Sequence, residues 1–299
     1  GYYQNFSDAH NLMSYRHTRA HNSLLVNGIG QPYSTEGYGS VMRAMGGQHI
    51  SYCLGDASHA YRSISNDPMW VDYFKQAGIE QTPENGFGAT PLTKYRRHVL
   101  MLHPHTVIVY DELEASEAVR WEWLLHSPTE FKIDAVKKTL STDNKTKGWV
   151  AVTQLFGGHV FTLSQTDRFV VPPAITGAEY PNQWHLTARV DGCSATRFLA
   201  IIQVGDEAVS IINRDGDTFN VGDWTIKAVL DASKAPELTV SHRTEQAVFS
   251  YGTDNPALNG NFYSRQFTGS SLLYDEIDGA YQVVEMTDRS PISTRVVNQ

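Results

Sequence analysis

The amino-acid sequence predicts an all-β protein, built as an antiparallel two-layer β-sandwich of the supersandwich kind. Short runs rich in β-branched and aromatic residues recur along the 299-residue chain, and pairs of turn-forming residues separate them. Helical periodicity rarely extends beyond two turns, and strands do not alternate with helices. This pattern disfavours a doubly wound parallel sheet and favours hairpins packed in two layers.

The strand signals follow one another in chain order. They are SLLVNG at 23–28, HVLML at 98–102, TVIVYDEL at 106–113, WVAVTQLF at 149–156, HVFTLS at 159–164, RFLAIIQV at 197–204 and DWTIKAVL at 223–230. Pairs such as Asn27-Gly28, Asp191-Gly192 and Asp215-Gly216 predict tight turns between strands. The best helical candidate is MWVDYFKQAG at 69–78.

The last fifty residues mix Gly, Asn, Ser and Tyr with two clearer strands, SSLLYDEI and AYQVVEMT. We therefore predict a small C-terminal sheet and divide the chain into a sandwich over 1–250 and a small β subdomain over 251–299. No internal repeat and no linker of biased composition marks a sharper boundary.

The charge balance restricts the partners of the chain. Its 24 basic and 32 acidic residues give a formal net charge of −8, which argues against nucleic-acid binding through a broad basic face. A polyanionic ligand would need a local basic site. No apolar run reaches the roughly 20 residues of a membrane span, so we predict no span. The two cysteines, Cys53 and Cys193, fit neither a disulfide framework nor a zinc-ribbon pattern.

The densest polar constellation lies at 15–22, with the sequence Tyr-Arg-His-Thr-Arg-Ala-His-Asn, directly before SLLVNGIGQ. Two arginines can contact a carboxylate or sulfate, and two imidazoles can hold a metal or exchange a proton. If the segment is a strand, alternation places His17, Arg19 and His21 on one face. A solvated charged strand is the other interpretation of the same pattern.

A family resemblance starts in this segment. The run Arg19-Ala20-His21-Asn22-Ser23-Leu24-Leu25-Val26-Asn27-Gly28, followed by Gly30-Gln31, resembles the AHN signature of heparinase II/III-like lyases. Further matches follow in the family's order at Gly55-Asp56-Ala57-Ser58 with Ala60-Tyr61, Tyr95 to Leu100, Val109 to Ala115, and Trp123-Leu124-Leu125-His126. After Ser127 only the general β-character is shared.

The resemblance implies a bacterial periplasmic or secreted polysaccharide lyase. In that family an N-terminal α/α-toroid packs on the β-sandwich, and uronate-containing polysaccharides are cleaved between them by β-elimination. We therefore expect this chain to be the C-terminal sandwich portion without the toroid. Its expected partners are an acidic polysaccharide or oligosaccharide and the toroid of the same protein.

The resemblance also implies a zinc site. The family binds zinc through a His-x-His segment, an aspartate and the histidine of the AHN motif, which His21 matches. Gly1-Tyr2-Tyr3 resembles the residues that follow the other ligands. One imidazole cannot hold zinc, which takes three or four protein ligands. We therefore expect an incomplete zinc site and little lyase activity in the isolated chain.

Elimination needs a group that neutralises the uronate carboxylate, a base for the C5 proton and an acid for the departing oxygen. Tyr3 and Tyr15, which flank the motif, are the candidates for a catalytic tyrosine, although a packing role is the simpler alternative for each. The candidate substrate-binding residues are Arg16, Arg19, Arg97 and His126. Ordinary solvation or packing is the alternative for these side chains.

Two other functions remain open from the sequence. A non-catalytic carbohydrate-binding or interface module could stack sugars on exposed Trp70, Tyr73 and Phe74. A different β-rich carbohydrate-active enzyme, such as a glycosidase, would need a carboxylate pair across a cleft. No spacing in the sequence identifies such a pair.

Overall fold

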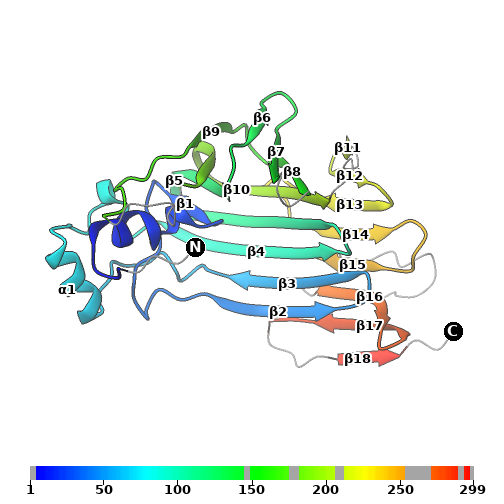
Figure 1. The fold of residues 1–299 in the computed structure, drawn as a ribbon. Coiled ribbons are helices and arrows are strands. Elements are labelled where there is room, and N and C mark those ends of the chain that lie inside the picture. Colours follow the sequence, from blue (N-terminus) through cyan, green and yellow to red (C-terminus); the bar gives the residue numbers. More distant parts are fainter. Residues whose placement is uncertain are drawn as a thin grey trace.

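The computed structural model describes residues 5–144, 149–174, 182–205, 212–252, 271–288 and 293–296. Two antiparallel sheets lie face to face, as Figure 1 shows, and the predicted β-sandwich is confirmed. The first sheet has the order β2-β3-β4-β5-β10-β8-β7-β6, with β1 added to β5 and β9 added to β10. The second sheet is a meander from β11 to β18 in chain order.

The first sheet contains the two longest strands of the described chain. Its strands are β1 (Leu24–Val26), β2 (Ser40–Gly46), β3 (Ile50–Asp56), β4 (Leu92–Leu102), β5 (Thr106–Ser127), β6 (Lys132–Asp134), β7 (Thr139–Asn144), β8 (Trp149–Gly157), β9 (Thr162–Thr166) and β10 (Trp184–Gly205). The second sheet contains β11 (Ile212–Asp215), β12 (Thr218–Val221), β13 (Trp224–Ala228), β14 (Leu238–His242), β15 (Val248–Tyr251), β16 (Ser271–Ile277), β17 (Ala280–Met286) and β18 (Ser293–Val296).

The strands after residue 251 differ from the expected separate C-terminal sheet. β16 pairs with β15, and β17 and β18 follow it in the same sheet. These strands therefore extend the second layer of the sandwich. An isolated hairpin would be marginal in water, whereas addition to an existing sheet satisfies its backbone groups and buries its apolar face.

The main core fills the space between the two layers. Ile50, Leu100 and Leu199 enter it from the first sheet, and Phe219 and Phe249 enter it from the second. All five are completely buried. Burial of each such side chain stabilises the fold by about 1.5–3 kcal/mol, so this core is the principal attachment between the sheets.

The strands β5 and β10, each of 22 residues, extend well beyond the sequence signals that predicted them. The pair Asp191-Gly192, predicted as a turn, instead lies within β10, where the pairing register with β5 shifts between Val190 and Cys193. Gly192 has a φ of 72°, as a bulge in a continuous strand allows. Beyond this bulge the two strands carry Trp121 and Val190 into a second core with Leu24.

Four short helices complete the described structure: the π-helix η1 (Asn11–Tyr15), the 3₁₀ helices η2 (Thr18–Ala20) and η3 (Pro83–Asn85), and α1 (Pro68–Gln76). They gather at the end of the first sheet that lies away from the second sheet (Figure 1). Within the described ranges, no helix combines the length and the hydropathy needed to cross a bilayer.

The helix α1 confirms the helical prediction at 69–78. The Asp67 carboxylate accepts a hydrogen bond from the Met69 amide at 3.1 Å, and Pro68 occupies the first helical position. Phe74 is buried in a local core, and Trp70 and Tyr73 pack against that core. The stacking surface expected for a sugar-binding module is therefore wrong for Phe74, because the helix buries its apolar face.

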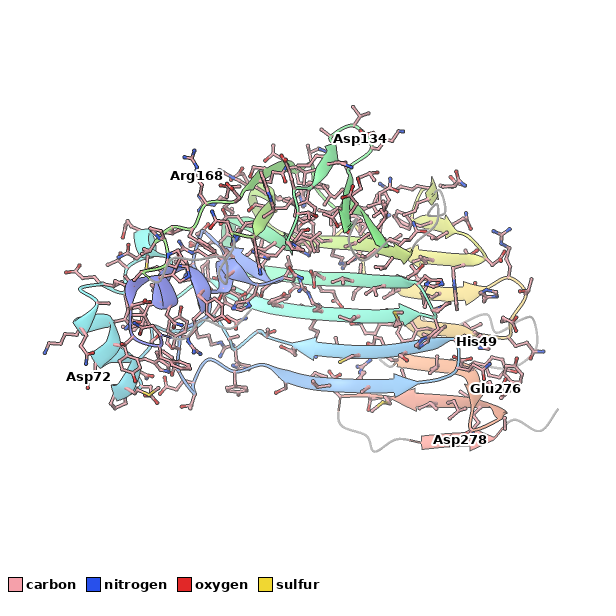
Figure 2. The ribbon with its side chains drawn as sticks, in the orientation of Figure 1. His49, Asp72, Asp134, Arg168, Glu276 and Asp278 are labelled. Atoms are coloured by element: carbon pink, nitrogen blue, oxygen red, sulfur yellow. The ribbon has the colours of Figure 1, made fainter. Side chains whose placement is uncertain are left out.

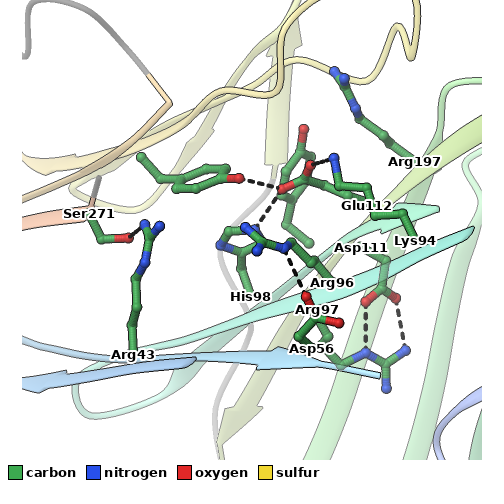
Figure 3. A network of polar contacts seen from close by, with 12 residues as sticks. Arg43, Asp56, Lys94, Arg96, Arg97, His98, Asp111, Glu112, Arg197 and Ser271 are labelled. Atoms are coloured by element: carbon green, nitrogen blue, oxygen red, sulfur yellow. Dashed lines mark hydrogen bonds and ion pairs between the residues drawn. The ribbon is translucent and has the colours of Figure 1, made fainter. Parts of the chain in front are cut away.

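A chain of polar groups crosses the main core between the sheets, and Figure 3 shows its two ends, at Arg43 and Ser271 and at His98 and Glu112. The Arg43 guanidinium donates to Ser271 Oγ at 2.9 Å, and Ser271 Oγ donates to Tyr52 Oη at 3.0 Å. Tyr52 Oη lies 3.0 Å from His98 Nδ1, and His98 Nε2 lies 2.9 Å from Glu112 Oε1. Because Ser271 uses the Tyr52 oxygen as acceptor, Tyr52 donates to Nδ1 and His98 donates through Nε2.

Glu112 receives two further contacts at the end of this chain. The Tyr251 hydroxyl donates to Oε1 at 2.8 Å, and Lys94 Nζ lies 2.6 Å from Oε2 as an ion pair. Burial lowers the pKa of His98, which is completely enclosed, so the imidazole is neutral and Lys94 balances the Glu112 charge. His98 is therefore a core histidine, and both of its ring nitrogens are hydrogen-bonded.

Candidate functional site

The segment that contains the predicted site is helical and does not form a strand. Residues 11–15 form a π-helix and residues 18–20 a 3₁₀ helix, so the expected alternation of His17, Arg19 and His21 along a strand face is wrong. The buried side chains Leu12 and Met13 pack on Phe74 and Phe87, which fixes the segment against α1 and η3. Packing of these apolar residues outweighs the alternating polar pattern.

His17 has a structural role at the start of η2. Its Nδ1 accepts hydrogen bonds from the Arg19 amide at 3.1 Å and from Arg19 Nε at 3.0 Å, and its Nε2–H donates to the Gly86 carbonyl at 3.0 Å. Burial lowers its pKa to about 3, with a smaller contribution from the Arg19 charge, so the ring is neutral. A Cβ on Gly86, which has a φ of 88°, would lie 2.6 Å from Nε2, so only glycine permits this contact.

His21 follows η2 directly and is exposed. Its ring donates a hydrogen bond to the Arg16 backbone carbonyl, and its pKa is lowered because neighbouring groups partly desolvate it. A histidine that ligates a metal commonly uses one ring nitrogen in this way, bonded to a carbonyl that fixes its orientation. This geometry is compatible with the ligand role that the AHN signature suggested.

Two further imidazoles lie beside this segment. His126, near the end of β5, and His185, near the start of β10, are direct cross-strand partners with ring centroids 4.6 Å apart. His126 Nε2 lies 3.0 Å from His185 Nδ1 and 2.8 Å from the Arg19 carbonyl oxygen. Burial lowers the pKa of His126 to about 4, and the neighbouring His185 and His21 add to this effect.

Asn22 connects His126 to the His21 segment. Its side-chain oxygen accepts from the His126 amide at 2.8 Å and lies 3.0 Å from His126 Nδ1. The predicted residues His21 and His126 are therefore brought together, and the cluster adds His185, which the sequence analysis missed. With a pKa of about 4, His126 is neutral near pH 7, the form in which an imidazole nitrogen can accept a hydrogen bond or bind a metal.

The Arg97 side chain holds the backbone next to His21. Its Nε and Nη2 bind Asp111 at 2.7 and 2.8 Å, and its Nη1 donates to the Asn22 carbonyl at 2.5 Å. Trp123 Nε1 also donates to Asp111, at 2.9 Å. These contacts give Arg97 a structural function, and its predicted contact with substrate stays a prediction.

Three predicted site residues remain: Arg16, Tyr15 and Tyr3. Arg16 is stacked over the Trp70 ring at 4.6 Å and lies 5.6 Å from the centre of Phe6. Tyr15 is half-buried at the end of η1. Tyr3 lies outside the described residues. The predicted roles of Arg16, Tyr15 and Tyr3 stay predictions.

The described side chains near His21 do not meet the requirements of a zinc site. In the part of the chain that the structure describes, no group of three or more His, Cys, Asp or Glu side chains could hold a metal ion. Zinc needs at least three protein ligands, so these residues alone do not fit it. His21 is one candidate ligand.

Comparisons with known proteins agree with the fold. No curated protein matches the chain. Solved structures similar to it include a heparinase III, the BT4657 gene product, with a TM-score of 0.52 and 13% identity over 79% of this chain and 30% of that one. Another, titled "Crystal Structure of Heparinase III", has a TM-score of 0.52 and 14% identity over 84% of this chain and 32% of that one.

A third similar structure is a mutant of the heparan sulfate lyase HepC from Pedobacter heparinus, with a TM-score of 0.50 and 13% identity over 79% of this chain and 31% of that one. The chain thus spans about a third of the length of these proteins, and the likeness concerns the fold. The family profile described as "Heparinase II/III-like, C-terminal" matches residues 1–186, which is more than half of the sequence. The chain therefore belongs to the heparinase II/III-like C-terminal family.

Proposed function

We propose that this chain is the β-sandwich portion of a polysaccharide lyase that cleaves uronate-containing acidic polysaccharide by β-elimination. The observation that carries the proposal is the convergence of His21, His126 and His185 at one end of a sandwich of this family. The arginines of the same segment supply cationic groups for an acidic polymer. The reaction requires proton transfer, by a base and an acid, together with recognition of the carboxylate.

The reaction removes the proton from C5 of the uronate and breaks the bond between C4 and O4. The electron pair of the C–H bond forms the C4–C5 double bond, and the departing oxygen takes a proton. Neutralisation of the C6 carboxylate makes the C5 proton more acidic. Tyr3 and Tyr15 are the proposed tyrosines on the sandwich side, and arginine side chains are the proposed contacts to acid groups.

The proposed site needs groups from the rest of the protein. In this proposal an α/α-toroid of the same protein faces the sandwich and supplies the group that neutralises the carboxylate. Zinc, if bound, takes His21 together with ligands outside the described residues. The proposed location is periplasmic or extracellular, where polysaccharides too large for uptake are available.

The test is an elimination assay with the complete product of the gene that encodes this chain and, separately, the 299-residue chain. Both proteins are incubated with heparan sulfate, alginate and other uronate polymers, and the unsaturated uronate is followed at about 232 nm, because elimination creates a conjugated alkene. We expect the complete gene product to be active and the chain alone to be slower by at least about 10²-fold. Absence of absorbance change with every uronate polymer would contradict the proposal.

The change His21→Ala in the active protein should reduce turnover by roughly 10²-fold or more. It removes an imidazole that, in this proposal, transfers a proton or binds the metal. His105→Ala is the matched control. His105 is exposed in the turn before β5, whereas the imidazole cluster lies at the other end of β5, where His126 is located. The control should retain nearly full activity. Equal activities of the two variants would exclude a role for His21 in turnover.

A further inference from the structure

We propose that a pocket beside η2 binds a carboxylate or sulfate group of an acidic saccharide through Arg19 and Arg120. This inference rests on the proposed function and adds a binding subsite to it, separate from the imidazole cluster. The pocket has a volume of about 540 Å³, which lies in the range usual for small-molecule sites. The two guanidinium groups, the turn at Asn27 and Gly28, and Glu84 at the start of η3 line it.

Arg19 has no carboxylate within ion-pair distance among the described residues, and the charge of Glu122 acts on it only from further away. Its Nε donates to His17 Nδ1 at 3.0 Å and its Nη2 donates to the Asn85 carbonyl at 3.0 Å, and both acceptors are neutral. The Arg19 side chain is half-buried. A cation partly withdrawn from water and held by neutral acceptors gains most from an arriving anion.

The environment of Arg19 differs from that of other arginines in the same end of the sheet. Arg97 binds the Asp111 carboxylate with two nitrogens, and Arg96 is paired with Asp56 and Asp288. Those arginines already have their counter-charges. Arg19 combines an unpaired charge with a position on the wall of an open pocket.

Arg120 is fixed at the same pocket by the turn after β1. The Asn27 side chain accepts from the Arg120 amide at 2.8 Å, and the Asn27 amide donates to the Arg120 carbonyl at 2.8 Å. Gly28 has a φ of 83°, and a Cβ there would lie 2.8 Å from Arg120 Nη2. The glycine therefore both forms the turn and leaves room for the guanidinium.

The lining of the pocket contains two arginines and one glutamate, so positive charge exceeds negative charge by one within it. Glu122 is not part of the lining, but its Oε2 lies 3.3 Å from Arg120 Nε as an ion pair, so Arg120 already has a counter-charge. Glu84 is an exposed carboxylate at the mouth, and it opposes an incoming anion. Other acidic residues, such as Asp72, Asp134 and Asp278, lie at separate outer parts of the molecule (Figure 2).

The pocket lies next to the imidazole cluster through Arg19 itself. The Arg19 carbonyl contacts His126, whereas the Arg19 side chain reaches the carbonyl of Asn85 at the end of η3. Arg19, in the short helix η2, thus contacts the imidazole cluster through its backbone and the pocket through its side chain. A polymer that carries acid groups on successive sugars can place one unit at the imidazoles and another acid group in the pocket.

The experiment titrates the 299-residue chain with glucuronic acid, glucose 6-sulfate and neutral glucose, and follows arginine Nε–H signals by ¹⁵N NMR. We expect saturable shifts with at least one acidic sugar and none with glucose, and the two acidic sugars distinguish carboxylate from sulfate. Arg120→Gln and Arg19→Gln should each weaken binding roughly tenfold, because each removes a charge-assisted contact. Glu84→Gln should strengthen binding about twofold.

The control is Arg243→Gln, which makes the same change in charge at an exposed arginine after β14 in the second sheet. Its affinity should equal that of the unaltered chain, and amide spectra check that every variant is folded. Equal binding of glucose, or affinities of both Arg19→Gln and Arg120→Gln within twofold of the unaltered chain, would overturn the proposal. Because no bond is cleaved, this result is independent of the elimination assay.

Discussion

Replacing Glu112 by Ala should lower the free energy of unfolding by about 3–5 kcal/mol, because removal of one member of a buried ion pair leaves its partner uncompensated. Lys94 loses its 2.6 Å partner, and the Tyr251 hydroxyl loses its acceptor. His98 Nε2–H also loses the oxygen to which it donates. Two buried donors would then lack an acceptor, and Lys94 would keep only its 3.2 Å contact with Glu114.

The same carboxylate makes stability depend on pH. Burial alone would raise the pKa of Glu112, but the hydrogen bond from His98 and the interactions with Lys94 lower it from 4.5 to about 2. A lowered folded-state pKa stabilises the fold above pH 4.5, and this contribution is lost as pH falls towards 2.

Urea unfolding of the unaltered chain, Glu112→Ala and Glu112→Gln between pH 2 and 7 measures both effects. The stability difference between the unaltered chain and Glu112→Gln should shrink as pH falls through this window. Glu114→Ala is the control, because Glu114 is half-exposed and its contact with Lys94 is 3.2 Å long; its effect should stay within about 1 kcal/mol. Equal stabilities of Glu112→Ala and Glu114→Ala would refute the argument.

Changing Asp111 to Ala should destabilise the chain by about 3–5 kcal/mol and also displace His21. Asp111 is completely buried, binds Arg97 with both oxygens and accepts from Trp123. Without it the Arg97 charge is left uncompensated, and the hold of Arg97 on the Asn22 carbonyl is weakened.

Unfolding experiments and the NMR signals of the His21 ring measure the two parts of this prediction. Asp111→Asn is the conservative variant, because the amide keeps an acceptor for Trp123 but lacks the charge that pairs with Arg97. It should lose less stability than Asp111→Ala. An unchanged His21 environment in Asp111→Ala would mean that Arg97 does not position the site.

Local sequence patterns predicted much of the fold. The strands, the helix at α1 and the turn at Asn27 and Gly28 depend on side-chain periodicity and on residues that favour special backbone angles, and both are visible within a few residues. The continuity of β10 through Asp191 and Gly192 was missed, because the same residue pair suits a turn and a bulge. Only pairing with β5 decides between them.

The candidate site was predictable in part for the same reason. His21 and His126 stand in recognisable motifs, whereas His185 joins them only through the pairing of β5 with β10. Arg120 reaches the pocket because the turn after β1 bonds its backbone. Such neighbours are far apart in sequence, and side-chain periodicity contains no information on which distant strands pair.

The polar chain from Arg43 to Glu112 also determines how the two layers are aligned. Strand side chains repeat every two residues, so an entirely apolar interface would tolerate a slide of β15 that replaces Tyr251 by Phe249. In the observed alignment Tyr251 donates to Glu112, while Phe249 packs on the Tyr52 ring at 4.3 Å. After a slide, a benzene ring would face the carboxylate, which would lose one of its donors. The misaligned sandwich is thereby penalised, although its apolar contacts would be nearly as extensive.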